Sequence, residues 1–139
     1  MYGGLGVGKT YLAACICNEL VEHGYHCCFT SLREVQDTWG NDHNRELTHA
    51  IHRLGCHDLV VLDDYLRERN TSWMQELSFR VADMLDTRRV PTVVTTNAPV
   101  EFLAKPPAEV AAALDRIKHR AKVVEVKGAN MRQVLGGWR

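Results

Sequence analysis

The sequence predicts an α/β fold in which helices cover both faces of a largely parallel sheet. Short apolar runs alternate along the chain with longer segments of helical periodicity, the pattern of consecutive strand–helix units. One run, residues 59–62, is apolar at every position, as in a strand buried on both faces. A glycine-rich loop opens the first helical segment, and such loops recur where α/β proteins bind phosphate groups.

Composition narrows the possible functions before any motif is considered. The 139 residues fit one domain, and 17 basic residues balance 17 acidic ones. Because the formal net charge is zero, any contact with nucleic acid must use a local patch of basic residues rather than the overall charge of the protein. No apolar run approaches the roughly 20 residues of a membrane helix, and we expect a cytoplasmic protein with no membrane partner. The odd number of cysteines, five, favours reduced thiols.

The first half of the chain is predicted to contain three helices and two strands. Apolar residues recur at helical spacing over residues 9–22, and a short apolar strand follows at residues 26–30. A capping box of Ser31 and Glu34 then starts a pair of helices over residues 31–54. The apolar run at residues 59–62 is too short for a helix and is predicted to be a buried strand.

The second half continues the same alternation. Residues 72–88 return to helical spacing, and a β-branched strand follows at residues 92–95. A loop is expected at residues 103–107, a helix at residues 109–121 and a last strand at residues 123–126. The chain from Gly128 onward is predicted to be a tail. The alternation therefore extends through the chain without a second domain.

The loop before the first helix matches the phosphate-binding pattern G-x-x-x-x-G-K-[ST]. Its glycines allow a tight turn that aims backbone N–H groups at phosphate oxygens, and the helix dipole adds positive potential. Lys9 is expected to reach the β- and γ-phosphates, and the Thr10 hydroxyl to bind Mg²⁺. The expected nucleotide contacts are Gly3, Gly4, Leu5, Gly6, Val7, Gly8, Lys9, Thr10 and the adjoining Tyr11. The loop predicts a nucleoside triphosphate site, for ATP with Mg²⁺.

Polar side chains follow two of the predicted strands. Asp63 and Asp64 end the strand at residues 59–62, where Asp63 is placed to hold the Mg²⁺ shell and Asp64 to polarise the attacking water. Asn97 ends the next strand and can sense the γ-phosphate. The competing interpretations are a solvated acidic turn and an ordinary turn asparagine.

Arginines gather on one predicted helix. Arg116 and Arg120 are one helical turn apart on the same face. An arginine supplied from a neighbouring molecule can stabilise the charge on a transferring phosphoryl group. A solvated basic face is the simpler alternative.

These four elements, in this order, resemble the AAA+ ATPases of the DnaC/IstB group. The matching segments are residues 2–13, 58–64, 89–97, 113–116 and 124–132, which together extend over almost the whole chain. The resemblance implies a P-loop NTPase core with a parallel sheet of about five strands in the order 5-1-4-3-2. It predicts that residues 1–139 form one AAA+ ATPase domain with a truncated first strand and without an upstream helicase-binding domain.

The same resemblance assigns roles to individual residues. Asn97 would be the sensor 1 residue, and Arg116 the arginine finger that acts on ATP bound to a neighbouring subunit. Arg132 would contact the nucleotide, since it matches the arginine of a Gly-x-Ser-Tyr-Arg segment common in the group, whereas Asn130 and Met131 depart from it. Asp64 is one methylene shorter than the more usual glutamate, and we expect slower hydrolysis for that reason.

The function implied is an ATP-hydrolysing protein that acts on DNA, and the favoured role is loading the replicative helicase. The alternative is an IstB-type transposition helper. Residues 88–92 and the Asp-Asp pair look more like loaders, whereas residues 111–116 and 124–128 look at least as much like transposition helpers. A non-catalytic ATP-binding fragment and a small P-loop kinase are more remote alternatives.

The implied partners are single-stranded DNA, a replicative helicase or transposase, and further copies of the chain that associate through the ATP site. The helical region at residues 31–54 corresponds to the part that initiators and loaders use against single-stranded DNA. Arg33 and Arg45 are the expected DNA contacts, with simple surface solvation as the alternative.

Overall fold

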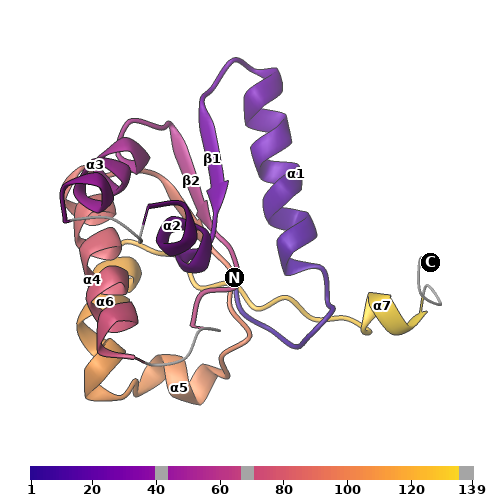
Figure 1. Ribbon diagram of the computed structural model, residues 1–139. Coiled ribbons are helices and arrows are strands. Elements are labelled where there is room, and N and C mark those ends of the chain that lie inside the picture. The colour runs from indigo at the N-terminus through magenta and orange to yellow at the C-terminus, as the bar shows by residue number, and fades with distance from the viewer. Residues whose placement is uncertain (40–43, 67–70, 135–139) are drawn as a thin grey trace.

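The computed structural model describes residues 1–39, 44–66 and 71–134 of the chain and has the predicted alternation of helices and strands (Figure 1). A parallel sheet forms the centre, and helices lie on both of its faces. The elements are α1 (Lys9–Glu22), β1 (Cys27–Thr30), α2 (Leu32–Trp39), α3 (Asn44–Leu54), β2 (Leu59–Leu62), α4 (Ser72–Thr87), β3 (Thr92–Val94), α5 (Val100–Ala104), α6 (Ala108–Lys118) and α7 (Met131–Val134).

The sheet has three extended strands in the order β1-β2-β3, all parallel. Beyond β3, Tyr2 makes parallel bridges to Thr96 on one side and to Glu125 on the other. Its amide donates to the Val124 carbonyl at 3.0 Å, and the Val126 amide donates to the Tyr2 carbonyl at 2.8 Å. The predicted strand order 5-1-4-3-2 is therefore present. The positions of the first and fifth strands, however, are occupied by single bridges at Tyr2 and Glu125 rather than by full strands.

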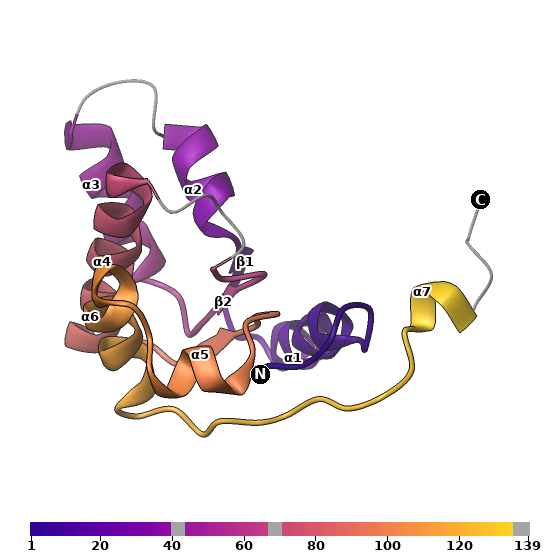
Figure 2. The ribbon, with the colours of Figure 1, turned by 90° about the horizontal axis from the view of Figure 1, so that it is seen from below.

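Alternate residues of β2 divide the interior into two cores, as the period of a strand requires. Val60 and Leu62 face the larger core, which α2, α3, α4 and α6 cover. Leu59 and Val61 face a smaller core against α1. Figure 2 shows α1 on one side of the sheet and the other large helices on the opposite side. All four side chains of β2 are buried, so the prediction of a strand buried on both faces is confirmed.

Three local predictions were wrong. Among the described residues, the expected strand at residues 123–126 makes only the bridge at Glu125, because its backbone hydrogen bonds in the sheet all go to the single residue Tyr2. Pro99 caps a short helix, α5, which overlaps a stretch expected to be a loop. A further short helix, α7, forms in the predicted tail. None of the helices in the described ranges is long and apolar enough to span a membrane.

Candidate nucleotide-binding site

The glycine-rich loop turns through two left-handed residues before α1 begins. Gly6 has φ 74° and Gly8 has φ 96°, values that favour glycine because a Cβ atom would be strained there. Gly8 caps α1 without a side chain, and its carbonyl accepts the Leu12 amide at 2.9 Å. Because no side chain caps the first turn, its amides and the dipole end face the loop, which suits an anion.

Lys9 is folded back onto this loop. Its ammonium donates to the carbonyls of Gly3 at 2.9 Å and Gly4 at 2.6 Å, and to Asn97 Oδ1 at 2.7 Å. Burial lowers the pKa of Lys9, while the nearby carboxylates of Asp64 and Asp63 oppose that shift. The Lys9 ammonium therefore lies within the loop, and the oxygens of a bound phosphate group can replace its contacts with the two carbonyls.

The two acids lie directly across from Lys9 and Thr10. The Thr10 hydroxyl donates to Asp63 at 3.0 Å from Oδ1 and 3.2 Å from Oδ2, joining α1 to the end of β2. Asn97 Nδ2 donates to Asp64 Oδ1 at 2.7 Å. A hydroxyl beside a carboxylate supplies the hard oxygen ligands that Mg²⁺ prefers. The residues present therefore fit a magnesium ion between Thr10 and Asp63.

Sheet geometry explains why residues far apart in the sequence meet here. The carboxyl ends of parallel strands lie at one edge, where ligands bind in open α/β sheets. The Asp63 amide donates to the Thr30 carbonyl at 2.8 Å, which continues the ladder with β1 past the end of β2. Asp64 then turns with φ 55°, a left-handed value unusual for a residue with a side chain.

The segment before α7 packs against the loop, a contact that the sequence pattern did not predict. The Met131 amide donates to the Gly6 carbonyl at 3.0 Å, and Asn130 Oδ1 accepts from the Arg132 amide at 3.1 Å. A Cβ atom on Gly6 would lie 1.9 Å from Asn130 Oδ1. The Arg132 charge also contributes to lowering the Lys9 pKa. The structure thus brings Arg132 to the predicted site and adds Asn130, which the sequence marked only as a departure from the family pattern.

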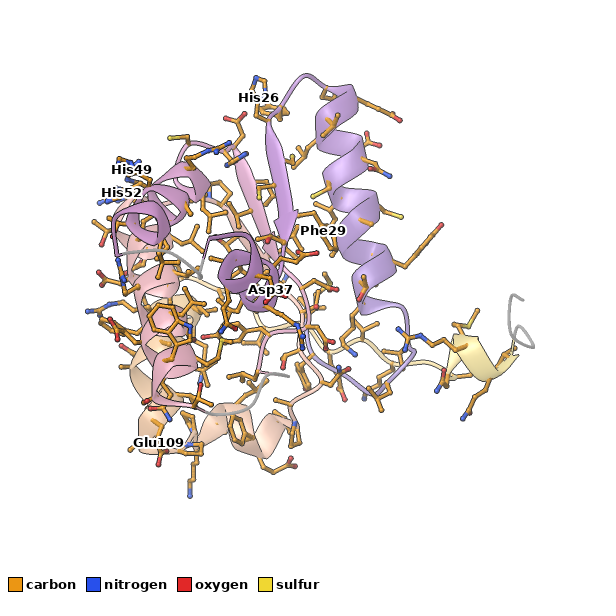
Figure 3. All side chains as sticks on the ribbon, viewed as in Figure 1. His26, Phe29, Asp37, His49, His52 and Glu109 are labelled. Carbon is orange, nitrogen blue, oxygen red and sulfur yellow. The ribbon has the colours of Figure 1, made fainter. Side chains whose placement is uncertain are left out.

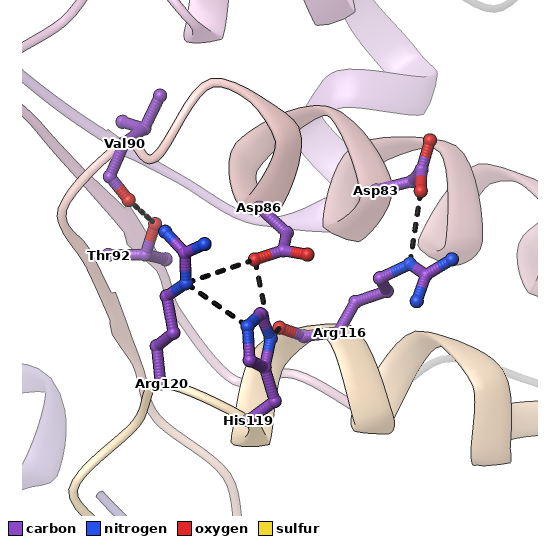
Figure 4. Close-up of polar contacts among 7 residues, drawn as sticks. All are labelled: Asp83, Asp86, Val90, Thr92, Arg116, His119 and Arg120. Carbon is purple, nitrogen blue, oxygen red and sulfur yellow. Dashed lines mark hydrogen bonds and ion pairs between the residues drawn. The ribbon is translucent and has the colours of Figure 1, made fainter.

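The structure places Arg116 on α6, where it pairs with a residue of α4. Its Nε donates to Asp83 Oδ1 at 3.1 Å, a bridge between α6 and α4 (Figure 4). Arg120 and His119 both approach Asp86 Oδ1, with nitrogen–oxygen distances of 3.8 and 3.4 Å. Arg116 is about half exposed, so it is accessible to a neighbouring molecule.

The remaining predicted contacts lie at the surface. Tyr11 is 73% exposed on the first turn of α1. Arg33 is exposed on α2 and pairs with Asp37, at 3.4 Å between Arg33 Nε and Asp37 Oδ2. Arg45 belongs to α3, but its side chain lies outside the described residues. The exposure of Tyr11 and Arg33 leaves their proposed ligand contacts available.

The histidines of α3 do not form a metal centre in the described part of the chain. His49 and His52 project outward from α3 (Figure 3), and His52 Nδ1 lies 3.0 Å from an Arg88 guanidinium nitrogen. Among the described residues, no group of three or more His, Cys, Asp or Glu side chains could hold a metal ion.

Comparison with known proteins decides the family. A family model described as IstB-like ATP binding protein matches residues 1–135. The chain belongs to this family. The match includes the loop, both acids, Asn97 and the segment before α7, so the whole candidate site lies within the region shared by IstB-like proteins.

Individual relatives of this IstB-like chain include a replicative helicase loader and a putative insertion sequence ATP-binding protein. It is 26% identical over 144 residues to the replicative helicase loader DnaI of Bacillus subtilis, covering 95% of this chain and 46% of DnaI. It is 29% identical over 137 residues to a putative insertion sequence ATP-binding protein of Sinorhizobium fredii, covering 96% of this chain and 46% of that protein. The chain thus spans about half the length of these curated relatives.

Solved structures confirm the fold. The crystal structure of the DnaC helicase loader superposes with a TM-score of 0.74 at 20% identity, covering 91% of this chain and 76% of that chain. AMPPCP-bound DnaA from Aquifex aeolicus superposes with a TM-score of 0.75 at 19% identity, covering 95% of this chain and 40% of the DnaA chain. At these identities the likeness shows an AAA+ P-loop fold and not a shared activity.

Proposed function

We propose that this chain binds ATP with Mg²⁺ and hydrolyses it as the nucleotide-dependent core of a helicase loader acting on single-stranded DNA. The observation that carries the proposal is the convergence of Lys9, Thr10, Asp63, Asp64 and Asn97 at one sheet edge, joined by hydrogen bonds of 2.7 to 3.2 Å. Two acids and a lysine lie together there, a combination that Mg²⁺-dependent ATP hydrolysis needs and a simple anion site does not.

Each residue has a role that follows from its position. The loop amides and Lys9 bind the phosphates, and Arg132 of α7 adds a positive charge near Lys9. Thr10 and Asp63 would hold Mg²⁺, which neutralises phosphate charge during phosphoryl transfer. Asp64 orients the attacking water, and Asn97, already bonded to both Lys9 and Asp64, links the γ-phosphate position to that acid.

Arg116 completes the proposed site from a neighbouring copy of the chain. Its guanidinium contacts Asp83 rather than its own nucleotide loop. An arginine supplied in trans stabilises charge in the transition state and is worth about 10³–10⁵ in rate. Self-association through the ATP site would therefore control hydrolysis.

The direct test is ATP hydrolysis by the chain with and without single-stranded DNA, beside measurement of nucleotide binding. We expect hydrolysis that DNA stimulates, and loss of binding in Lys9→Ala. Lys105→Ala, at an exposed lysine after α5, is the matched control and should behave like the parent. Binding without hydrolysis would identify a non-catalytic module, and absence of Mg²⁺-dependent ATP binding would refute the proposal.

A transposition helper is the second candidate, and the insertion sequence ATP-binding relative favours it. In that role, the ATP-bound chain would bind a transposase instead of a replicative helicase. Co-purification of the chain, with ATP, against each class of partner distinguishes the two. Retention of the helicase alone supports the loader role, and retention of the transposase alone contradicts it.

A further inference from the structure

Thr95 lies between the two acids of the candidate site. It follows β3 and is only 1% exposed. Its hydroxyl lies 2.6 Å from Asp63 Oδ1 and 2.9 Å from the Asp64 amide nitrogen. One buried side-chain oxygen therefore contacts the metal-binding acid and the backbone of the water-orienting acid.

The direction of both hydrogen bonds follows from the chemistry of the partners. An amide can only donate, so the Asp64 N–H occupies a lone pair of the Thr95 oxygen. An ionised carboxylate can only accept, so the single hydroxyl proton of Thr95 points at Asp63. Bonds to a charged acceptor are the stronger kind, and 2.6 Å is short as expected for a hydroxyl on a carboxylate.

The backbone around Thr95 fixes where this hydroxyl can be. The Thr95 amide donates to the Leu62 carbonyl at 3.1 Å, and its carbonyl accepts the Tyr65 amide at 2.8 Å. These bonds anchor Thr95 to residues on either side of the acid pair. A β-branched side chain also has few χ1 rotamers, so little freedom remains in the position of its oxygen.

Both acids need such support. The Asp63 carboxylate must present fixed oxygens, and Thr10 contacts it from the opposite element, α1. Asp64 has φ 55°, a conformation that persists only where the surroundings hold it. Its amide bond to Thr95 is such a restraint, because it fixes the turn from which the Asp64 side chain projects.

We propose that Thr95 is a positioning residue that fixes the spacing between the metal-binding and water-orienting acids. The proposal rests on the ATPase function proposed above and extends it to a residue to which the sequence motifs assigned no role. In this role Thr95 acts through its hydrogen bonds to Asp63 and Asp64. Removing its hydroxyl should weaken the Mg²⁺-dependent part of nucleotide binding and slow hydrolysis.

The chain offers a matched control in the next residue. Thr96 is also buried, at 6% exposure, and its hydroxyl donates at 2.7 Å to the Tyr65 carbonyl rather than to an acid. Thr96→Val removes a buried hydroxyl with the same change in shape as Thr95→Val. Thr95→Ser keeps the hydroxyl and removes only the methyl group. Comparing the three variants separates the loss of a hydroxyl at Asp63 from the loss of any buried hydrogen bond.

The test measures affinity for a fluorescent ATP analogue in Mg²⁺ and in EDTA, together with kcat and KM for ATP. The Mg²⁺ gain is the ratio of the affinity in Mg²⁺ to the affinity in EDTA. For Thr95→Val we expect both this gain and kcat to fall by about 10–100-fold, the range for residues that orient metal ligands. Its affinity in EDTA should match the parent. Thr95→Ser should retain both properties, and Thr96→Val should lose neither.

Two results would overturn the proposal. One is a Thr95→Val chain with the parent's Mg²⁺ gain and kcat. The other is a Thr96→Val chain with the same losses as Thr95→Val, which would indicate a general packing effect. Hydrogen exchange of the Asp64 amide gives a separate readout: protection should fall in Thr95→Val and persist in Thr95→Ser. If the parent binds no nucleotide but the exchange pattern holds, the proposed function fails while the geometry around Thr95 stands.

Discussion

Substituting Gly3 by alanine tests how the nucleotide loop is joined to the sheet. Gly3 has φ 153°, and a Cβ atom built on it would lie 2.3 Å from the backbone oxygen of Val126. No side-chain rotation can relieve a contact with a backbone carbonyl. The segment that contains Val126 would have to move, and it is held by the hydrogen bonds that Tyr2 makes to Val124 and Val126.

The cost of Gly3→Ala can be worked from these contacts. A backbone conformation that essentially only glycine adopts costs an alanine about 1–3 kcal/mol. The two Tyr2 hydrogen bonds, if broken, remove about 0.5–1.5 kcal/mol each. The expected loss is therefore about 2–6 kcal/mol, a large part of the roughly 5–15 kcal/mol by which a domain is stable.

Urea unfolding of three glycine variants checks this estimate. Gly24 has φ 85° with open space around its Cβ position, so Gly24→Ala measures the backbone cost alone. Gly128 has neither a positive φ nor a close neighbour, and Gly128→Ala should unfold like the parent. Gly3→Ala should be the least stable. Equal midpoints for the Gly3 and Gly24 variants would refute the close approach of the loop to Val126.

Three further predictions concern the core and the site. Leu77→Ala, at a fully buried position of α4, should lower the free energy of unfolding by about 2–5 kcal/mol, whereas Phe79→Ala, at a 39% exposed position, should cost clearly less in the same urea titration. Asp64→Glu should raise kcat severalfold at unchanged nucleotide affinity, because the longer side chain reaches further toward water, and a lower kcat would count against the water-orienting role. ATP affinity should fall as pH rises through the lowered pKa of Lys9, since only the ammonium form binds phosphate. An affinity that does not change with pH until the ordinary lysine pKa of about 10.4 would contradict this.

The sheet and the centre of the site could be predicted because local sequence signals determine them. The continuous apolar run of β2 requires burial on both faces, and the acids that follow it must then lie at the carboxyl edge of the sheet. The glycine pattern likewise requires the left-handed turns observed at Gly6 and Gly8. The hydrogen bond between Thr10 and Asp63 follows from these two facts together.

Contacts that depend on long-range packing could not be predicted in the same way. The segment with Asn130 reaches the loop only after the chain has crossed the sheet beside Tyr2, and no local pattern marks that approach. The pairing of Arg116 with Asp83 depends on how α6 packs on α4. Thr95 looked like any β-branched strand residue, and only its position beside both acids distinguishes it.

A mixing experiment tests whether the nucleotide site of one chain is completed by Arg116 of another. Lys9→Ala removes the phosphate-binding cation, and Arg116→Ala removes the group proposed to act in trans. Each variant alone should be inactive in ATP hydrolysis. With random pairing at head-to-tail interfaces, an equimolar mixture should regain roughly a quarter of the parent rate. A mixture that stays inactive, or an Arg116→Ala chain that hydrolyses ATP like the parent, would contradict the claim.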